Sequence, residues 1–432
     1  RQLVDYYYKK YGDGPIDALA RCMMRVRGSY ALAVMYKDYP EELYVARKDS
    51  PMIIGAEKGE TFLASDVPAI LNYTRNVYYI GNLEIAKLEK GKVSFFNIDR
   101  EEIAKEITEI KWDAKAAEKA GFEHFMMKEI HEQPTAVRDT LSPRIKDGRI
   151  DLSELGLDEE AIKNVRRIYI IGCGSAYHVG VAARYVFESL ARLPVEVDVA
   201  SEFRYRDPVL EPDSMAVIIS QSGETADTLA ALRECKERGV RTIGIVNVVG
   251  SSIAREADAT LYTWAGPEIA VATTKAYSTQ MVVLNLLGLY FGDIMGTIDL
   301  ETYTAMVQGI QALPHQMEEI LSDTGYIQAA ARELAGHDQV FFIGRNLDYA
   351  LSLEGSLKLK EISYIHTEAY ASGELKHGTI ALITEDTPVV AVVTQEKLKD
   401  KELSNIREVQ SRGASVVLFV RESISMADAE YA

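Results

Sequence analysis

Residues 168–175 read Ile-Tyr-Ile-Ile-Gly-Cys-Gly-Ser, a continuous apolar run that ends in a glycine-marked turn. The same order recurs at Met215 to Ile219, before Ser-Gln-Ser-Gly, and at Thr242 to Val246, after a helical stretch that ends near Gly239. Continuous apolar strands that alternate with helices are typical of a parallel sheet covered on both faces. We therefore predict an α/β domain with a doubly wound parallel sheet over residues 161–300.

The same pattern occurs a second time in the chain. Three landmarks recur at offsets of 172, 174 and 174 residues: 168–172 matches 340–344, 220–221 matches 394–395, and Gly239 matches Gly413. A period this long lies outside the range of solenoid repeats, so it indicates two tandem copies of one α/β domain. We place the second copy at residues 325–432. We expect it to be C-terminally incomplete, because its third strand, Ser415 to Val420, is followed by only 12 residues.

The first hundred residues have a different sequence pattern. Short runs of β-forming residues are separated by turn residues such as Asp-Tyr-Pro at 38–40 and Glu-Lys-Gly at 57–59. This close spacing leaves no room for crossover helices, so we predict antiparallel strands. The runs are Tyr30 to Tyr36, Leu43 to Ala46, Met52 to Ile54, Thr61 to Ala64 and Val77 to Ile80. We assign residues 1–110 to this strand-rich unit and residues 111–160 to a linker with lead-in helices.

Composition and charge exclude several classes of protein. The 47% hydrophobic and 26% charged content is ordinary for a globular domain. A net charge of −17 disfavours sequence-independent nucleic-acid binding and docking on anionic membranes. The three cysteines lie far apart without metal-ligand spacing, so we expect no metal site and a reducing, cytoplasmic location. The longest apolar stretch, Met281 to Phe291, is too short to span a bilayer and predicts a core helix.

The strongest chemical signal is the turn Ser220-Gln221-Ser222-Gly223-Glu224-Thr225, between a strand and a helical stretch. Free N–H groups at a helix start, together with hydroxyl donors, suit a phosphate monoester. Open α/β sheets bind ligands beyond the carboxyl ends of their strands, which is where this turn lies. The alternative is a surface turn in which Ser222 is an ordinary N-cap. The second copy has Thr-Gln-Glu-Lys at 394–397, so we predict phosphate binding in the first copy only.

Two other segments could reach the same ligand. Cys173-Gly174-Ser175 follows the first parallel strand, and its glycine allows a close backbone approach. The segment lacks a full G-x-G-x-x-G pattern, so a dinucleotide site is weakly supported. We interpret Cys173 as a small buried hydrophobic residue rather than a nucleophile. Val271-Ala272-Thr273-Thr274-Lys275 is either a helix-capping segment or a ligand-contacting loop, and the sequence leaves both open.

Acid–base groups are predicted near the start of the second copy. In the helix predicted over Leu351 to Ile365, Glu354, Lys358 and Glu361 share one face. Such a face is commonly a solvated ion-pair stripe. Here the apolar neighbours leave little of the helix free, and Lys and Glu one turn apart could bind a sugar hydroxyl and move a proton. His377, in a loop bracketed by glycines, is a further acid–base candidate, although a lone loop histidine is more often inert.

Five segments together resemble glutamine:fructose-6-phosphate aminotransferases, also called glucosamine-6-phosphate synthases, and the resemblance runs through the whole chain. They are 128–134 (KEIHEQP), 200–206 (ASEFRYR), 220–228 (SQSGETADT), 357–366 (LKLKEISYIH) and 373–378 (GELKHG). The resemblance implies two tandem SIS (sugar isomerase) domains after the later part of an α+β N-terminal-nucleophile glutaminase domain. It further implies a cytoplasmic homodimer that makes glucosamine 6-phosphate from fructose 6-phosphate and glutamine, without a cofactor, at the first step of amino-sugar synthesis.

The resemblance also implies roles for individual residues. The phosphate would be held by Ser220, Gln221, Ser222 and Thr225, and the sugar site would be lined by Cys173, Gly174, Ser175, Val271 and Thr273. Glu361 would move the proton between C1 and C2 of the sugar, and Lys358 would hold hydroxyls near those carbons. His377 would help to open the ring, reaching into the site of a neighbouring subunit.

Departures from the family pattern make us expect a fragment. Residue 1 is Arg, whereas the family's glutaminase nucleophile is an N-terminal Cys, so we expect the start of that domain to be missing, with no glutamine hydrolysis by this chain. We also expect the C-terminal tail, with its essential Lys, to be missing. Ala176 stands where the family commonly has a hydroxyl. Two rival functions are a non-catalytic sugar-phosphate-binding protein and an amino-sugar deglycase.

Overall fold

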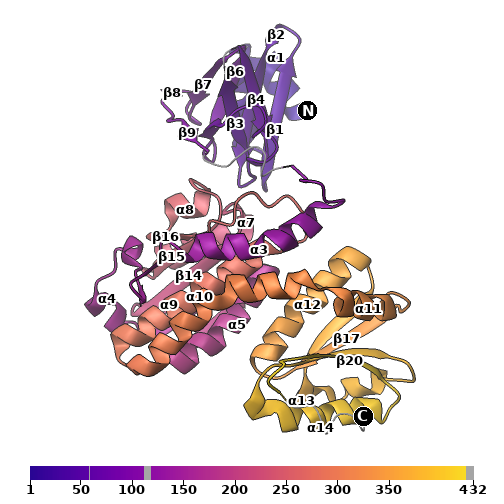
Figure 1. The fold of residues 1–432 in the computed structure, drawn as a ribbon. Helices are drawn as coiled ribbons and strands as arrows, with labels where there is room; N and C mark the ends of the chain where they lie inside the picture. Colours follow the sequence, from indigo (N-terminus) through magenta and orange to yellow (C-terminus); the bar gives the residue numbers. More distant parts are fainter. Residues whose placement is uncertain (58, 111–117, 425–432) are drawn as a thin grey trace.

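The computed structural model describes residues 1–57, 59–110 and 118–424. Figure 1 shows an N-terminal unit of antiparallel strands, a first parallel α/β unit beneath it, and a second parallel α/β unit beside the first. The first residues of the predicted linker, 111–117, and the end of the predicted second copy, 425–432, lie outside the described residues.

The N-terminal unit contains two antiparallel sheets. Helices α1 (Gln2–Tyr11) and α2 (Pro15–Met23) precede them. One sheet has the order β1 (Tyr30–Tyr36), β2 (Tyr39–Lys48), β6 (Ile85–Glu89), β7 (Lys92–Phe96), β8 (Glu102–Ile103). The other has the order β4 (Glu60–Ala64), β3 (Ile53–Glu57), β5 (Asn76–Tyr79), β9 (Thr108–Glu109). The predicted antiparallel pairing is confirmed, whereas β6 to β9 were not predicted.

The first parallel sheet is buried on both faces, as its apolar strands predict. Its order is β13 (Val195–Val199), β12 (Arg167–Gly172), β14 (Ser214–Ser220), β15 (Arg241–Val246), β16 (Ala259–Tyr262). Alternate residues of a strand face opposite sides. In β12, Ile168 and Ile170 pack in the cluster that contains α5 (Ser175–Leu190) and α9 (Lys275–Met295). Tyr169 and Ile171 pack on the other face, in the cluster that contains α7 (Ala226–Glu237).

The segment between residues 118 and 160 joins this first core. It forms α3 (Phe125–Leu141), the hairpin β10 (Ile145–Lys146) with β11 (Arg149–Ile150), the 3₁₀ turn η2 (Ser153–Leu155) and α4 (Glu159–Lys163). Val137 and Leu141 of α3 are buried in the same cluster as α9. The remaining helices of the unit are α6 (Ala200–Phe203), α8 (Ser252–Glu256) and α10 (Leu300–Ser322). None of the helices in the described residues has the length and hydropathy needed to cross a bilayer.

The second parallel sheet repeats the strand order of the first. Its order is β18 (His366–Ala371), β17 (Gln339–Gly344), β19 (Pro388–Val393), β20 (Ser415–Val420), which corresponds to β13, β12, β14 and β15. The internal duplication predicted from the offsets is therefore confirmed. Its helices are α11 (Gly325–Leu334), α12 (Leu347–Ser363), α13 (Ser372–Leu375) and α14 (Lys399–Gln410), with the 3₁₀ turns η3 (Thr379–Leu382) and η4 (Glu396–Leu398).

Two local predictions in this unit need correction. The helix predicted over Leu351 to Ile365 begins at Leu347 and ends at Ser363, because Tyr364 adopts a left-handed conformation with φ of 64°. The segment around His377 is only partly a loop. Strand β18 ends at Ala371, and Ser372–Leu375, which precede His377, form α13.

Helices α5 and α12 join the two parallel units. Val181 and Ala182 of α5 pack against Ala350 of α12 in a shared apolar cluster. This contact brings α12, from the second unit, next to the carboxyl edge of the first sheet. The position of α5 on its own sheet therefore determines where both helices lie at that edge.

Gly180 allows the close approach of α5 to its sheet. A Cβ at this position would lie 2.9 Å from both Ile170 Cγ2 and Val197 Cγ1, so Gly180→Ala should lower the free energy of unfolding by about 1–3 kcal/mol. Gly309 is exposed on α10, and a Cβ there would have no atom within 4 Å, so Gly309→Ala should raise stability by up to about 1 kcal/mol through helix propensity. Chemical denaturation measures both variants. Equal effects would contradict the close packing of α5.

Candidate active site

A cavity of about 230 Å³ lies at the carboxyl edge of the first parallel sheet. The turns after β12 and β14 form one side, and α12 of the second unit contributes the other. Its lining residues are Cys173, Ser175, Ala176, Ile219, Ser220, Gln221, Ser222, Thr225, Thr228, Val271, Thr273, Gln280, Lys358 and Glu361. The fold thus brings together residues that the sequence singled out in four separate segments.

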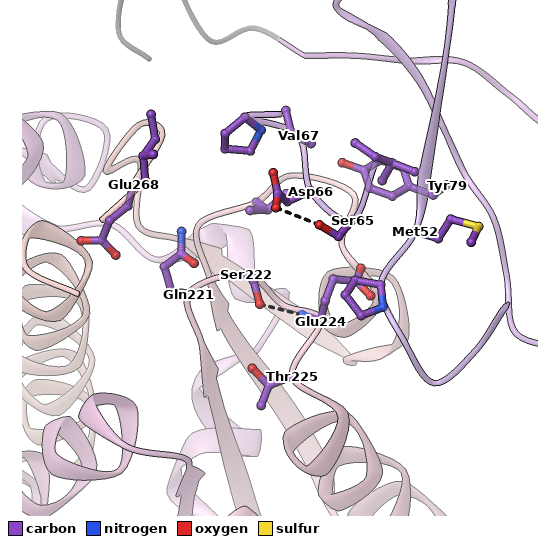
Figure 2. Close-up of a pocket in the computed structure, with 15 residues that line it drawn as sticks. Met52, Ser65, Asp66, Val67, Tyr79, Gln221, Ser222, Glu224, Thr225 and Glu268 are labelled. Carbon is purple, nitrogen blue, oxygen red and sulfur yellow. Dashed lines mark hydrogen bonds between the residues drawn. The ribbon is translucent and has the colours of Figure 1, made fainter. Parts of the chain in front are cut away.

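The Ser220–Thr225 turn is organised by its own hydroxyls. Ser220 Oγ accepts a hydrogen bond from Gly223 N at 3.0 Å and lies 2.9 Å from Thr225 Oγ1. Ser222 Oγ accepts from Glu224 N at 3.2 Å (Figure 2). Gly223 has φ of 66°, and a Cβ there would lie 2.0 Å from Ser251 Oγ, so only glycine fits.

Helix α7 presents its N-terminus to this cavity. It begins at Ala226, and its N-cap is Thr225, so the alternative of an N-cap formed by Ser222 is wrong. The side chain of Thr225 makes no capping bond to α7. The free N–H groups of its first turn, with the surrounding hydroxyls, therefore form an anion-binding arrangement that needs no lysine.

The charged face of α12 is buried at Glu354 and becomes exposed toward Glu361, so only its outer end resembles a solvated stripe. Glu354 is buried, and its carboxylate accepts hydrogen bonds from Ser175 Oγ at 2.7 Å and His178 Nδ1 at 2.8 Å, both on α5. Lys358 Nζ lies 3.5 Å from Glu354 Oε1 and 2.5 Å from Glu361 Oε2. Glu361 is the most exposed of these three charged groups. The cavity thus holds an ammonium beside a carboxylate that can accept a proton.

The segment at 271–275 leads into α9, whose cap is supplied by Glu268 from outside the segment, and two of its residues line the cavity. Thr273 Oγ1 donates to Glu268 Oε2 at 2.6 Å, and Glu268 Oε1 accepts from Thr274 N at 2.9 Å and Ala276 N at 3.1 Å. Glu268 therefore caps the start of α9. The side chain of Val271 is fully exposed at the cavity, and Thr273 lines it.

Cys173 lines the same cavity, whereas Gly174, which follows it in the chain, is not among the lining residues. Gly174 has φ of 55° and turns the chain from β12 into α5. The interpretation of Cys173 as a buried hydrophobic residue is wrong in one respect, because its side chain is half-buried and lines the cavity. Its sulfur lies 3.7 Å from Thr228 Oγ1, which donates toward it.

Two polar residues of the cavity were not predicted. Gln280 is buried on α9, and Thr228 is buried on α7, and both line the cavity. A polar residue in the apolar sequence of α9 is the signal that could have identified Gln280. His377 does not join this cluster within the chain. It is exposed after α13, with its backbone N–H bonded to Glu374 O at 2.9 Å.

The corresponding edge of the second sheet is filled by the chain's own carboxylates. Asp348 accepts hydrogen bonds from Thr394 N at 2.9 Å and from the Thr394 hydroxyl. Glu402 is buried, accepts from Ser372 Oγ and lies 3.5 Å from Arg345 Nε. Burial raises the pKa of Glu402 to about 7, because the charged form loses hydration. These groups leave no anion-binding arrangement like that of Ser220–Thr225 at the described part of this edge.

A second cavity, of about 460 Å³, lies between the N-terminal unit and the first parallel unit. Figure 2 shows Met52, Ser65 and Tyr79 on one side and Gln221, Ser222 and Glu268 on the other. The two units meet here through Tyr79, whose hydroxyl donates to Val249 O at 2.9 Å. Arg47 Nη1 lies 3.9 Å from Glu224 Oε2 across the same contact. The Ser220–Thr225 turn therefore borders both cavities.

Comparisons with known proteins agree with this arrangement. Residues 161–290 and 333–430 match the SIS domain family. The chain is 52% identical over 421 residues to glutamine–fructose-6-phosphate aminotransferase (isomerizing) of Caldanaerobacter subterraneus subsp. tengcongensis, covering 97% of this chain and 69% of the relative. It is 52% identical over 416 residues to the protein of that name from Clostridium acetobutylicum, covering 96% and 68%. The C-terminal domain of glucosamine-fructose-6-phosphate aminotransferase from Francisella tularensis superposes with a TM-score of 0.69 at 41% identity, covering 73% of this chain and 88% of that chain.

Glu402 should make stability depend on pH. Its pKa is higher in the folded state, about 7, than the ordinary 4.5, so the folded chain binds the proton more tightly. Stability from this group is therefore present below pH 4.5 and is lost as pH rises through 7, by on the order of 3 kcal/mol. Relative to wild type, Glu402→Gln should gain stability between about pH 5 and pH 8 in denaturant titrations. A difference that is constant with pH, as expected for the exposed control Glu396→Gln, would contradict the assignment.

Proposed function

The chain belongs to the family of glutamine–fructose-6-phosphate aminotransferases, and on that premise we propose that its 230 Å³ cavity is the site where fructose 6-phosphate becomes glucosamine 6-phosphate. The reaction transfers nitrogen derived from glutamine and isomerises a ketose to an aldose. One observation carries the proposal: an uncapped helix N-terminus with hydroxyls and a Lys–Glu pair line the same cavity. The first group of residues suits a phosphate, and the second suits proton transfer.

The phosphate binds at the start of α7. Ser220, Ser222 and Thr225 supply hydroxyl donors, Gln221 supplies an amide, and the first-turn N–H groups of α7 supply the partial positive charge. This leaves Lys358, the ammonium that lines the cavity, free to act at the other end of the sugar.

The sugar chain then extends from the phosphate toward α12. Ser175, Cys173 and Gly174 border it on the α5 side, and Val271 and Thr273 border it on the α9 side. Lys358 binds hydroxyls near the reacting carbons, and the buried carboxylate of Glu354 keeps its ammonium in place. Fixing the substrate at both ends places C1 and C2 beside the side chain of Glu361.

Glu361 is the proton carrier of the isomerisation. Once nitrogen has replaced the oxygen at C2 as an imine, the carboxylate removes a proton from C1 and returns it to C2. The hydroxyl proton at O1 passes to the nitrogen, which leaves an aldehyde at C1 and an amine at C2. One carboxylate suffices because the two carbons are adjacent. Its partial exposure in the cavity and its contact with Lys358 support this role.

Ring opening is assigned to His377, acting on the site of a neighbouring subunit in a homodimer. Support comes from its exposure and from its position outside the cavity of its own chain. We further propose that residues 1–110 are the later part of the glutaminase domain, followed by the lead-in segment 111–160 and SIS domains over 161–300 and 325–432. The enzyme is proposed to act in the cytoplasm, on small molecules and not on nucleic acid or membranes.

Removing one hydroxyl from the phosphate site should weaken binding. Ser222→Ala deletes a donor to a phosphate oxygen, and we expect fructose 6-phosphate to bind about 5- to 100-fold more weakly by calorimetry. The matched control is Ser322→Ala, which removes an exposed hydroxyl on α10 and should leave the affinity unchanged. An unchanged affinity in Ser222→Ala would remove this residue from the site.

Neutralising the proton carrier should affect chemistry and not binding. Glu361→Gln preserves shape while removing the base, so in the complete enzyme kcat should fall by on the order of 10²-fold or more with the sugar affinity retained. Glucosamine 6-phosphate formed from added ammonia is the readout. Glu319→Gln, an exposed change on α10, serves as the control. A normal rate in Glu361→Gln would make this residue only a partner of Lys358.

A further inference from the structure

Helix α3 presents one polar face to the segment that borders the sugar cavity. Glu129, Glu132 and Gln133 lie at positions i, i+3 and i+4 of this helix, so their side chains share a face. They belong to the Lys128–Pro134 motif, which no step of the proposed reaction uses. The helix packs against α9, whose N-terminus follows the cavity segment.

All three side chains accept hydrogen bonds from residues that either precede α9 or lie in its first four positions. Glu129 is 1% exposed, and its Oε1 accepts hydrogen bonds from Ile269 N at 2.6 Å and Ala270 N at 3.1 Å. Two further contacts continue along the same face: Lys275 Nζ donates to Glu132 Oε2 at 2.8 Å, and Ser278 Oγ donates to Gln133 Oε1.

The segment that Glu129 binds lacks regular structure and depends on side chains for its shape. Residues 263–274 form no helix or strand, and buried backbone N–H groups need acceptors. Asn247 Oδ1 accepts from Ala265 N at 2.9 Å near the start, and Glu268 accepts the N–H groups at the end. Glu129 supplies the acceptor for the middle of the segment.

The middle of this segment separates the two cavities. Glu268 and Ile269 line the larger cavity, whereas Val271 and Thr273 line the sugar cavity. The side chain of Val271 is fully exposed, so packing does not hold it. Its place is therefore set by the hydrogen bonds on either side of it, to Glu129 at residues 269 and 270 and to Glu268 at Thr273 and Thr274.

We propose that Glu129 is a positioning residue for sugar binding, which acts by fixing the backbone at residues 269–270 and so the place of Val271 and Thr273. This inference rests on the proposed function of the smaller cavity. Burying a carboxylate costs free energy, and this cost is consistent with a need for a strong acceptor for the N–H groups of residues 269 and 270. Its Oε2 is buried without a hydrogen-bond partner among the described residues, and burial raises its pKa.

The test uses Trp264, which lies in the same segment with its ring 5.3 Å from that of Tyr262. The sequence has two tryptophans, so Trp112→Phe leaves Trp264 as the only one. In that background, fructose 6-phosphate is titrated against Trp264 fluorescence for wild type, Glu129→Ala and Glu129→Gln. We expect Glu129→Ala to bind the sugar at least about 10-fold more weakly and to shift the Trp264 emission. Glu129→Gln keeps one oxygen acceptor and should be intermediate.

Kinetic and stability measurements distinguish a positioning role of Glu129 from a general loss of stability. In the complete enzyme, KM for fructose 6-phosphate should rise in Glu129→Ala while kcat changes less than about 3-fold. The matched control is Glu318→Gln, which removes the exposed partner of Arg138 on α3 and should leave binding and emission unchanged. If Glu129→Ala does not fold, Glu129→Gln decides: weaker binding at an unchanged melting temperature supports the proposal.

Two results would overturn the inference in different ways. A folded Glu129→Ala or Glu129→Gln that binds the sugar as wild type does would show that the segment keeps its shape without this carboxylate. A loss of affinity in step with melting temperature would make Glu129 a structural residue only. A wild-type chain that does not bind fructose 6-phosphate would instead overturn the proposed function, and the inference with it.

Discussion

The arrangement of the site depends on the hydrogen bonds that the buried carboxylate of Glu354 accepts. It belongs to α12 of the second unit, yet it accepts hydrogen bonds from Ser175 and His178 on α5 of the first, and it lies beside Lys358. A buried ionic group of this kind adds little net stability, because desolvation offsets the attraction. Its hydrogen bonds instead link α12 of the second unit to α5 of the first at the edge of the cavity. The α5–α12 packing supplies the apolar part of the same contact.

The two copies of the domain share a strand order but differ in the chemistry at their carboxyl edges. In the first copy, hydroxyls surround an uncapped helix N-terminus, so the edge can receive an anion from solution. In the second copy, Asp348 and Glu402 occupy the corresponding edge and take up its donors. In the proposed site, the first copy therefore supplies the groups that would hold the phosphate, and the second copy supplies the Lys–Glu pair of α12.

Much of the fold was predictable because the parallel strands are buried on both faces, which makes their sequences continuously apolar and easy to identify. The hydroxyl-rich turn and the α12 face were predictable because their residues are close in sequence. Glu129 was not, because its contacts depend on how α3 packs rather than on a local pattern. The half-buried state of Cys173 and the short helix α13 depend on tertiary packing in the same way. Strands β6 and β9 pair with the distant strands β2 and β5, which no local pattern records. The β6–β7 and β7–β8 pairings are local, and the sequence prediction missed them.

The central claim is that the smaller cavity holds a sugar phosphate between α7 and α12. The most direct measurement is a crystal structure of the chain with fructose 6-phosphate bound. The account predicts a phosphate within hydrogen-bond distance of Ser220, Ser222 and Thr225, with C1 and C2 beside the carboxylate of Glu361. A sugar bound in the larger cavity between the N-terminal and first parallel units, or a phosphate away from the start of α7, would contradict it.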